Sequence, residues 1–188
     1  MKTVTSFFSL IFLVECMLAP NASAERMNHH PWFAQHSETE FIAQPSSRHW
    51  ATAGTRHLHN GNAPKGDRIV EQANHYRGTR YRFGGDSKYK GFDCSGLVRR
   101  IYNDLNLKKL PHTSSGLYKM GHPIHMNELR PGDLVFFKNT YKKGISHVGV
   151  YAGDNHFIHA QNRLHGVTVT SLADPYYQLH YAGARRLY

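Results

Sequence analysis

The stretch that decides the fold is Gly91-Phe92-Asp93-Cys94-Ser95-Gly96-Leu97-Val98. From Cys94 onward, apolar residues stand at positions 97, 98, 101, 102 and 105, the spacing of one face of a helix that extends to about residue 106. Asp93 directly precedes this pattern, and aspartate is a residue type that caps helix N-termini. The stretch therefore predicts a helix with a cysteine in its first turn.

The flanking residues predict helices before this point and strands after it. Residues 66–77 have helical spacing and are followed by Gly78, and a short helix is expected after Pro111, capped by Thr113. Beyond the turn at residues 131–132, alternating and β-branched runs predict strands at 133–138, 147–152, 157–160, 167–171 and 181–187. Helices followed by an antiparallel sheet of about five strands indicate an α+β domain.

A cysteine at a helix start is a candidate nucleophile. The positive end of the helix lowers the pKa of a thiol, and its free N–H groups can donate to an oxyanion. Alternation along the strand places Val148 and Val150 on the face expected to form the core and His147 on the other face. The turn at 153–155 brings the strand that bears His159 beside the strand of His147. We expect His147 to act as base and His159 to orient it, a papain-like set of roles. His156 is a rival, but alternation turns it to the other face.

Five blocks of sequence resemble the NlpC-type cell-wall cysteine peptidases in order and approximate spacing. They are residues 81–85, 91–98, 129–137, 147–151 and 157–160. The resemblance covers about residues 66–188. It is greatest to the Spr-type murein endopeptidases of Gram-negative bacteria, where the similarity continues through residues 174–176 and 184–186.

This resemblance implies a compact papain-like core that hydrolyses peptidoglycan stem peptides, which contain D-amino acids and diaminopimelate. No metal and no cofactor are implied. The implied catalytic residues are Cys94, His147 and His159, and the implied substrate contacts are Tyr81, Asp93 and Ser95. The chain departs from the family at His112, where arginine is frequent, and in a slightly long loop before the cysteine.

The N-terminus predicts export to the periplasm or the medium. Lys2, an apolar run over residues 7–18 and the small residues before position 25 are typical of a signal peptide spanning residues 1–24. Lipid attachment at Cys16 and a buried N-terminal helix are the alternatives. Cleavage after Ala24 would leave Cys94 as the single cysteine, without an internal disulfide partner. An unpaired thiol in an exported protein favours a functional cysteine over an inert buried one.

Residues 25–64 are expected to form a flexible linker to a domain spanning residues 65–188. This segment contains several prolines and small polar residues, and six histidines: His29, His30, His36, His49, His57 and His59. Their spacing matches no standard metal-ligand pattern, so we expect a spacer and no metal site.

The net charge of +10 resides entirely in residues 65–188, which carry 19 Lys and Arg against nine Asp and Glu. A basic domain favours acidic partners, here an anionic envelope polymer or a membrane surface, although a basic surface can also serve solubility alone. No nucleic-acid recognition pattern is present, and oligomeric state stays open. The alternatives to an endopeptidase are an amidase or acyltransferase on the same core, a secreted antibacterial toxin, and a non-catalytic wall-binding protein.

Overall fold

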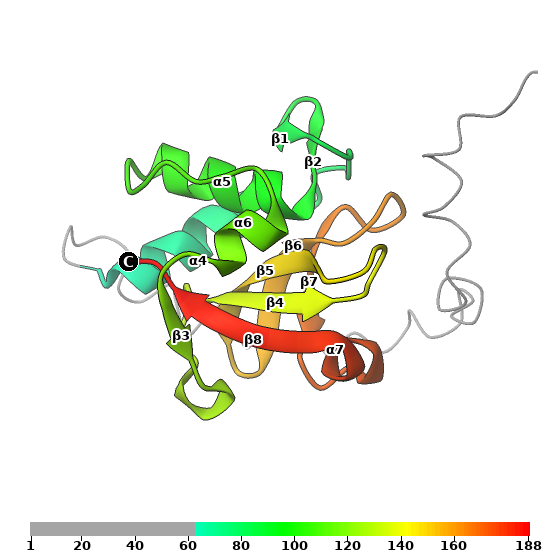
Figure 1. Cartoon of the computed structure of the whole chain (residues 1–188). Helices are drawn as coiled ribbons and strands as arrows, with labels where there is room; N and C mark the ends of the chain where they lie inside the picture. Colours follow the sequence, from blue (N-terminus) through cyan, green and yellow to red (C-terminus); the bar gives the residue numbers. More distant parts are fainter. Residues whose placement is uncertain (1–62) are drawn as a thin grey trace, which may run out of the picture. The chain divides into compact units, whose positions relative to one another are not determined.

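The computed structural model describes residues 63–188 (Figure 1). Their helices are α4 (Lys65–His75), α5 (Cys94–Asp104), α6 (Ser114–Tyr118) and α7 (Pro175–His180), with a 3-10 turn η3 (Met126–Glu128). The predicted signal peptide, and the linker up to residue 62, lie outside the described residues. Within residues 63–188, none of the helices has the length and apolar character needed to cross a membrane.

The main sheet is antiparallel throughout and has the strand order β3-β8-β4-β5-β6-β7. Its strands are β3 (His122–Ile124), β4 (Leu134–Lys138), β5 (Ile145–Gly153), β6 (His156–Ala160), β7 (Val167–Ser171) and β8 (Tyr181–Arg186). The five predicted strands are present, and the predicted α+β class is confirmed.

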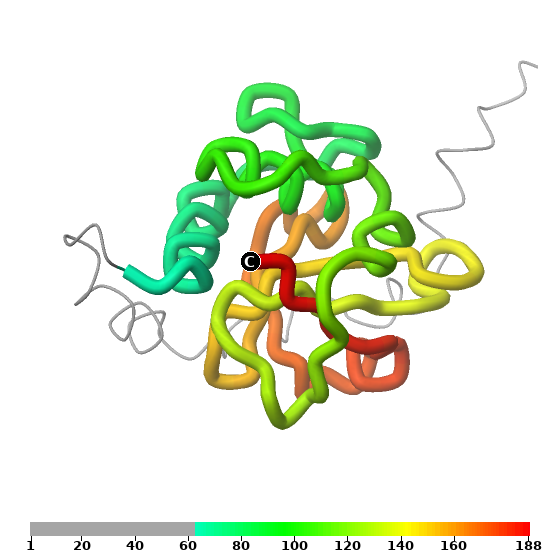
Figure 2. The backbone as a smooth tube through the Cα atoms, turned by 60° about the vertical axis from the view of Figure 1, so that its left-hand side comes forward, coloured from blue at the N-terminus to red at the C-terminus, as the bar shows by residue number. Residues whose placement is uncertain are grey.

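Helices α4, α5 and α6 gather on one side of this sheet (Figures 1 and 2). The apolar face of α5, predicted from its spacing, is buried through Leu97, Val98 and Ile101. These side chains share one core with Val148 and Val150 of β5. Each such side chain contributes about 1.5–3 kcal/mol by leaving water, so this core holds the start of α5 firmly against the middle of the sheet.

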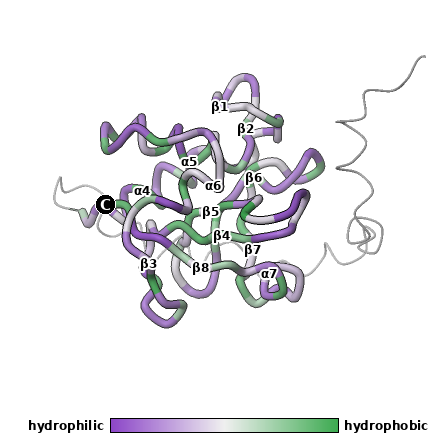
Figure 3. Tube along the Cα trace, viewed as in Figure 1, coloured by the Kyte–Doolittle hydropathy of each residue, from purple (hydrophilic) through white to green (hydrophobic). Residues whose placement is uncertain are grey.

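The opposite face of the sheet has its own apolar core. Val135 and Phe137 of β4 and Phe157 of β6 pack there against Tyr177 of α7. Because side chains alternate along a strand, β4 supplies one core with its even-numbered residues and the other with its odd-numbered ones. Colouring by hydropathy shows apolar residues along β4 and β5 and polar residues in many of the connecting loops (Figure 3).

Five short elements, which are three strands, the helix α7 and the 3-10 turn η3, were not predicted from the sequence. β3 adds a sixth strand at the sheet edge, and it is short, with Pro123 in its centre. The expected loop after Tyr81 contains a small hairpin formed by β1 (Asp86–Ser87) and β2 (Gly91–Phe92). α7 has six residues, too few to reveal a helical period, although Asp174 and Pro175 mark its start.

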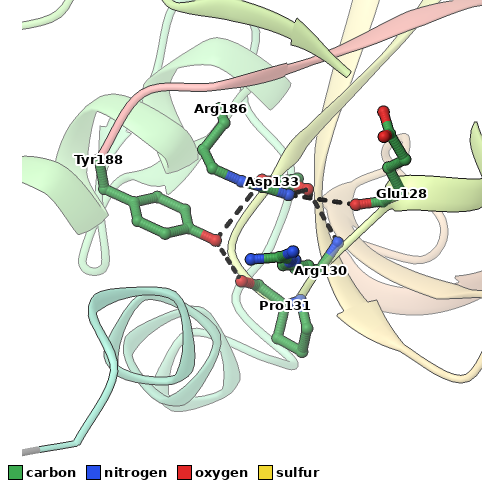
Figure 4. Close-up of polar contacts among 6 residues, drawn as sticks. All are labelled: Glu128, Arg130, Pro131, Asp133, Arg186 and Tyr188. Carbon is green, nitrogen blue, oxygen red and sulfur yellow. Dashed lines mark hydrogen bonds and ion pairs between the residues drawn. The ribbon is translucent and has the colours of Figure 1, made fainter. Parts of the chain in front are cut away.

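A polar clamp fastens the end of β8 to the turn before β4 (Figure 4). The buried Asp133 carboxylate accepts hydrogen bonds from Arg186 Nε and Nη2, each at 2.7 Å. This bonding raises the pKa of Arg186. Tyr188 donates its hydroxyl hydrogen to the Pro131 carbonyl at 2.8 Å. A Cβ on Gly66 would lie 2.0 Å from that carbonyl oxygen, so α4 begins tightly packed against the clamp.

Candidate active site

Cys94 is the first residue of α5, and Asp93 is its N-cap, as predicted. Asp93 Oδ1 accepts a hydrogen bond from the Gly96 N–H at 2.6 Å, which fixes the first helical turn. Only 5% of Cys94 is exposed to solvent. The candidate nucleophile is therefore held at a rigid helix start within the main core.

The sulfur of Cys94 meets the sheet at Val148 of β5. The backbone N–H groups of Val148, Ser95 and Cys94 itself hydrogen-bond to the sulfur, and each lowers its pKa. The pairing of β5 with β6 extends along β5 only as far as Val150, so β6 does not pair with β5 where the sulfur approaches. Since His147 immediately precedes Val148, the backbone of the candidate base lies next to the point where the sulfur approaches β5.

Burial keeps the Cys94 thiol protonated. It raises the pKa of the thiol to about 12, with a further contribution from the negative charge of Asp93. The expectation that the helix start would produce a low pKa is therefore wrong for the protein without substrate. The N–H groups act in the predicted direction, but the loss of water around the sulfur outweighs them.

The rings of His147 and His159 are joined by a hydrogen bond, which confirms the predicted pairing of the two histidines. His147 Nε2 lies 2.7 Å from His159 Nδ1, and His159 Nε2 lies 2.9 Å from Thr170 Oγ1 on β7. Burial lowers the pKa of His147 to about 4 and that of His159 well below its ordinary value. Both rings are therefore neutral near neutral pH, and in their contact one nitrogen donates and the other accepts.

Aromatic side chains enclose the two histidines. The Phe157 ring centroid lies 4.5 Å from that of His159, and the Phe137 centroid lies 6.0 Å from that of His147. The ring centroid of Tyr177 of α7 lies 6.3 Å from that of His147 and 5.3 Å from that of His159. These rings exclude water, which explains the low histidine pKa values and restricts movement of the imidazoles.

The three residues expected to contact substrate lie around Cys94. The Asp93 carboxylate accepts hydrogen bonds from Ser95 Oγ at 3.0 Å and from the Gly84 N–H at 2.8 Å. His112 Nε2 lies 3.4 Å from the same carboxylate, at the position where the family often has arginine. The pKa of Tyr81 is raised first by burial and then by its proximity to Cys94 and Asp93. Asp93 thus ties the loop after Tyr81 to the start of α5.

Thr170 and Tyr177 are site residues that sequence reasoning missed. Thr168 pairs directly with His159, so Thr170 is its diagonal neighbour, two residues farther along β7. Alternation along residues 167–171 could have revealed that neighbour once the hairpin register was known. Within residues 63–188, no group of three or more His, Cys, Asp or Glu side chains is arranged to hold a metal ion.

Comparison with known proteins shows which protein family the chain resembles. Residues 78–186 match the profile of the NlpC/P60 family. Murein DD-endopeptidase MepH of Escherichia coli (strain K12) is 44% identical over 112 residues, which cover 58% of this chain and 41% of that protein. Murein DD-endopeptidase MepS/Murein LD-carboxypeptidase of the same strain is 39% identical over 122 residues, covering 64% of this chain and 62% of that protein.

The fold agrees with a solved structure of the same family. The crystal structure of an NlpC/P60 family protein from Bacillus cereus ATCC 10987 superposes with a TM-score of 0.61 and 33% sequence identity. The match covers 65% of this chain and 40% of that one. The chain thus spans less than two thirds of the length of each of these relatives. With the profile extending over more than half of its residues, the chain belongs to the NlpC/P60 family.

Proposed function

We propose that this protein is an exported cysteine endopeptidase that hydrolyses peptide bonds of peptidoglycan. The observation that carries the proposal is the meeting of α5 and β5. The Cys94 sulfur accepts the Val148 N–H, and the adjacent His147 is bonded through Nε2 to His159. The sulfur thus approaches β5 one residue from the proposed base, and that base is hydrogen-bonded to the proposed orienting residue, which supports a Cys-His-His set of roles. Membership of the NlpC/P60 family supports the same chemistry.

The hydrogen bonds define the proton positions that this mechanism needs. His147 Nε2 is occupied by His159, so Nδ1 is the nitrogen that receives the thiol proton. His147 must then carry its resting proton on Nε2 and donate it to His159 Nδ1. His159 consequently carries its proton on Nε2 and donates it to Thr170 Oγ1. The Thr170 hydroxyl can accept this hydrogen bond, so it supports the tautomers that leave His147 free to act as base.

In the reaction, Cys94 attacks the carbonyl carbon of the scissile peptide bond while His147 Nδ1 takes up the thiol proton. Because burial disfavours a separated thiolate and imidazolium, proton transfer accompanies the attack. N–H groups at the start of α5 stabilise the oxyanion. His147 returns the proton to the leaving amine as the carbon–nitrogen bond breaks. Water then hydrolyses the thioester, with His147 again as base, and regenerates the thiol.

We propose the D-alanyl–diaminopimelate cross-link as the bond that is cut, in preference to the D-glutamyl–diaminopimelate bond. Two relatives are named murein DD-endopeptidases, and the cross-link joins two D-centres. We further propose that residues 1–24 are a signal peptide that directs export and is removed. Residues 25–64 then form a flexible linker before the catalytic domain at residues 65–188. Mass determination of the mature protein tests this, since cleavage after Ala24 predicts Glu25 as its first residue.

Digestion of purified sacculi tests the activity. The full chain should release uncross-linked muropeptides, and Cys94→Ala should release none, with its thermal unfolding unchanged as a control for folding. Mass spectrometry identifies the cut bond, because an endopeptidase leaves the amide between sugar and peptide intact and an amidase does not. Undiminished release by the Cys94→Ala variant would refute the thiol mechanism, whereas absence of release by the wild-type chain would favour a non-catalytic wall-binding role.

A further inference from the structure

The loop between β4 and β5, residues 139–144, is held in one shape by its own hydrogen bonds. The Asn139 N–H donates to the Gly144 carbonyl at 2.9 Å, and the Gly144 N–H donates to Asn139 Oδ1 at 2.8 Å. The Thr140 N–H donates to Oγ of the buried Ser146 at 2.9 Å. The tip of this loop, Tyr141-Lys142-Lys143, is therefore presented in a preorganised position.

The loop tip borders the candidate active site. The Tyr141 ring makes an edge-to-face contact with Phe83, with centroids 6.4 Å apart. The residue after Phe83, Gly84, donates its N–H to the N-cap Asp93, next to Cys94. The two rings are 39% and 62% exposed, which is unusual for aromatic side chains beside a packed site. The two rings form an exposed aromatic surface beside the loop that Asp93 ties to the start of α5.

Two unpaired cations accompany this surface. Lys142 and Lys143 are exposed, and Lys142 Nζ lies 5.6 Å from the centroid of the Tyr141 ring. The ion pairs formed within residues 63–188 include neither lysine. Since β4–β5 and β6–β7 are antiparallel hairpins on adjacent strands, their loops project from the same end of the sheet (Figure 1). Arg163 of the second loop adds a third exposed cation at that end.

We propose that Lys142 and Lys143, with the rings of Tyr141 and Phe83, form a subsite for the free carboxylate of the diaminopimelate residue on the leaving side of the cross-link. The inference rests on the proposed function. In this cross-link the scissile nitrogen is attached to a D-carbon that also bears a carboxylate, so an anionic group lies directly beside the cut bond. The aromatic rings support the aliphatic chain of the diaminopimelate, and the lysines neutralise its charge.

Charge complementarity selects this occupant over the sugar strand. Neutral N-acetylated sugars would gain from the aromatic rings but not from the two lysine charges. A carboxylate beside the scissile bond would gain from both. Because the lysines are exposed, their attraction for the carboxylate is moderate and is screened by salt. The subsite is therefore expected to affect KM, and to leave the chemical step at Cys94 unchanged.

Kinetics with two matched substrates test the subsite. The substrates are a purified cross-linked muropeptide dimer with the free carboxylate and the same dimer with that carboxylate amidated. The variant is Lys142→Ala/Lys143→Ala. Its control is Lys108→Ala/Lys109→Ala, a second exposed lysine pair that follows α5 at the end opposite to Cys94, about 15 Å away along the helix. All proteins are the full chain.

For the free carboxylate, the loop variant should raise KM about fivefold with kcat within about twofold of wild type, and the control variant should not change either constant. For the amidated dimer, wild type and loop variant should have the same KM. Equal losses on both substrates would overturn the proposal and indicate binding of glycan or another wall polymer. Identical wild-type KM values for the two dimers would also overturn it. Wild-type protein that cleaves neither dimer nor sacculi would instead refute the proposed hydrolase function.

Discussion

The hydroxyl of Thr170 offers a sharp test of the proposed tautomers. Valine has nearly the shape of threonine and suits a strand equally well, but it cannot accept the hydrogen bond that His159 Nε2 makes at 2.9 Å. In Thr170→Val, the active arrangement would leave a buried N–H without a partner. Moving the His159 proton to Nδ1 replaces the unpaired N–H by an unpaired acceptor nitrogen, and it forces the His147 proton onto Nδ1, where it blocks uptake of the thiol proton. Thr170 does not touch the reacting atoms and acts as a positioning residue.

The magnitude follows from the burial of His159, which is completely inaccessible to solvent. An unsatisfied buried donor costs about 1–3 kcal/mol, which corresponds to a loss of about fivefold to 150-fold in kcat. KM for a muropeptide dimer should remain within about twofold of wild type. Thr170→Ser is the matched control, because it retains the hydroxyl and should recover most of the rate.

Steady-state kinetics should be combined with ¹⁵N NMR of the histidine rings, which distinguishes the two tautomers. Thermal unfolding of each variant checks that the sheet is intact. A Thr170→Val enzyme with kcat within about twofold of wild type would refute the reasoning. So would a Thr170→Ser enzyme as slow as the valine variant, because the loss would then be structural.

Three further predictions concern stability. Asp133→Ala breaks a buried ion pair and should lower the free energy of unfolding by about 3 kcal/mol. Asp86→Ala breaks an exposed ion pair and should lower it by less than about 1 kcal/mol. Equal losses of unfolding free energy for the two variants in urea titrations would contradict this prediction. Gly96→Ala should cost more than about 3 kcal/mol, because its Cβ would lie 1.9 Å from a backbone oxygen. At Gly144 a Cβ would meet open space, but the backbone φ is +80°, so Gly144→Ala should lower the free energy of unfolding by only about 1 kcal/mol. Similar melting temperatures for the Gly96→Ala and Gly144→Ala variants would exclude the steric explanation. The pKa of His147 is lowered from 6.5 to about 4, so the folded protein binds fewer protons than the unfolded chain between these values. The free energy of unfolding should therefore have its full value above pH 6.5 and fall by about 3 kcal/mol as the pH approaches 4. A free energy of unfolding that does not change with pH over this range would contradict the burial of a neutral His147 ring.

Local patterns were sufficient to predict the elements that build the site. The helix at Cys94 has a strong cap and a wide apolar face, so its start could be assigned to the residue. Alternation along β5 and a short turn were enough to bring His147 and His159 to one face, because side-chain direction in a strand depends only on parity. Both inferences use interactions between residues that are close in the sequence.

The missed features depend on packing between distant segments. Cys94 is buried in a core shared by residues of α5, β5 and β6, and this burial decides the direction of its pKa shift. Thr170 reaches His159 only through the register of β7 on β6. Tyr177 lies on a six-residue helix whose position against the sheet no local pattern reveals. β3 is a short edge strand that exists because β8 pairs with it.

The position of β8 has a consequence for the order in which the molecule can be completed. β8 is formed by residues 181–186, yet it lies inside the sheet between β3 and β4. A ribosome delivers these residues after all the other strands, so β4 presents an unpaired edge for as long as synthesis of the domain is unfinished. Such edges recruit other strands and promote aggregation. A released chain truncated before residue 181 should therefore be a preferred client for chaperones and proteases, whereas a chain that includes β8 covers this edge.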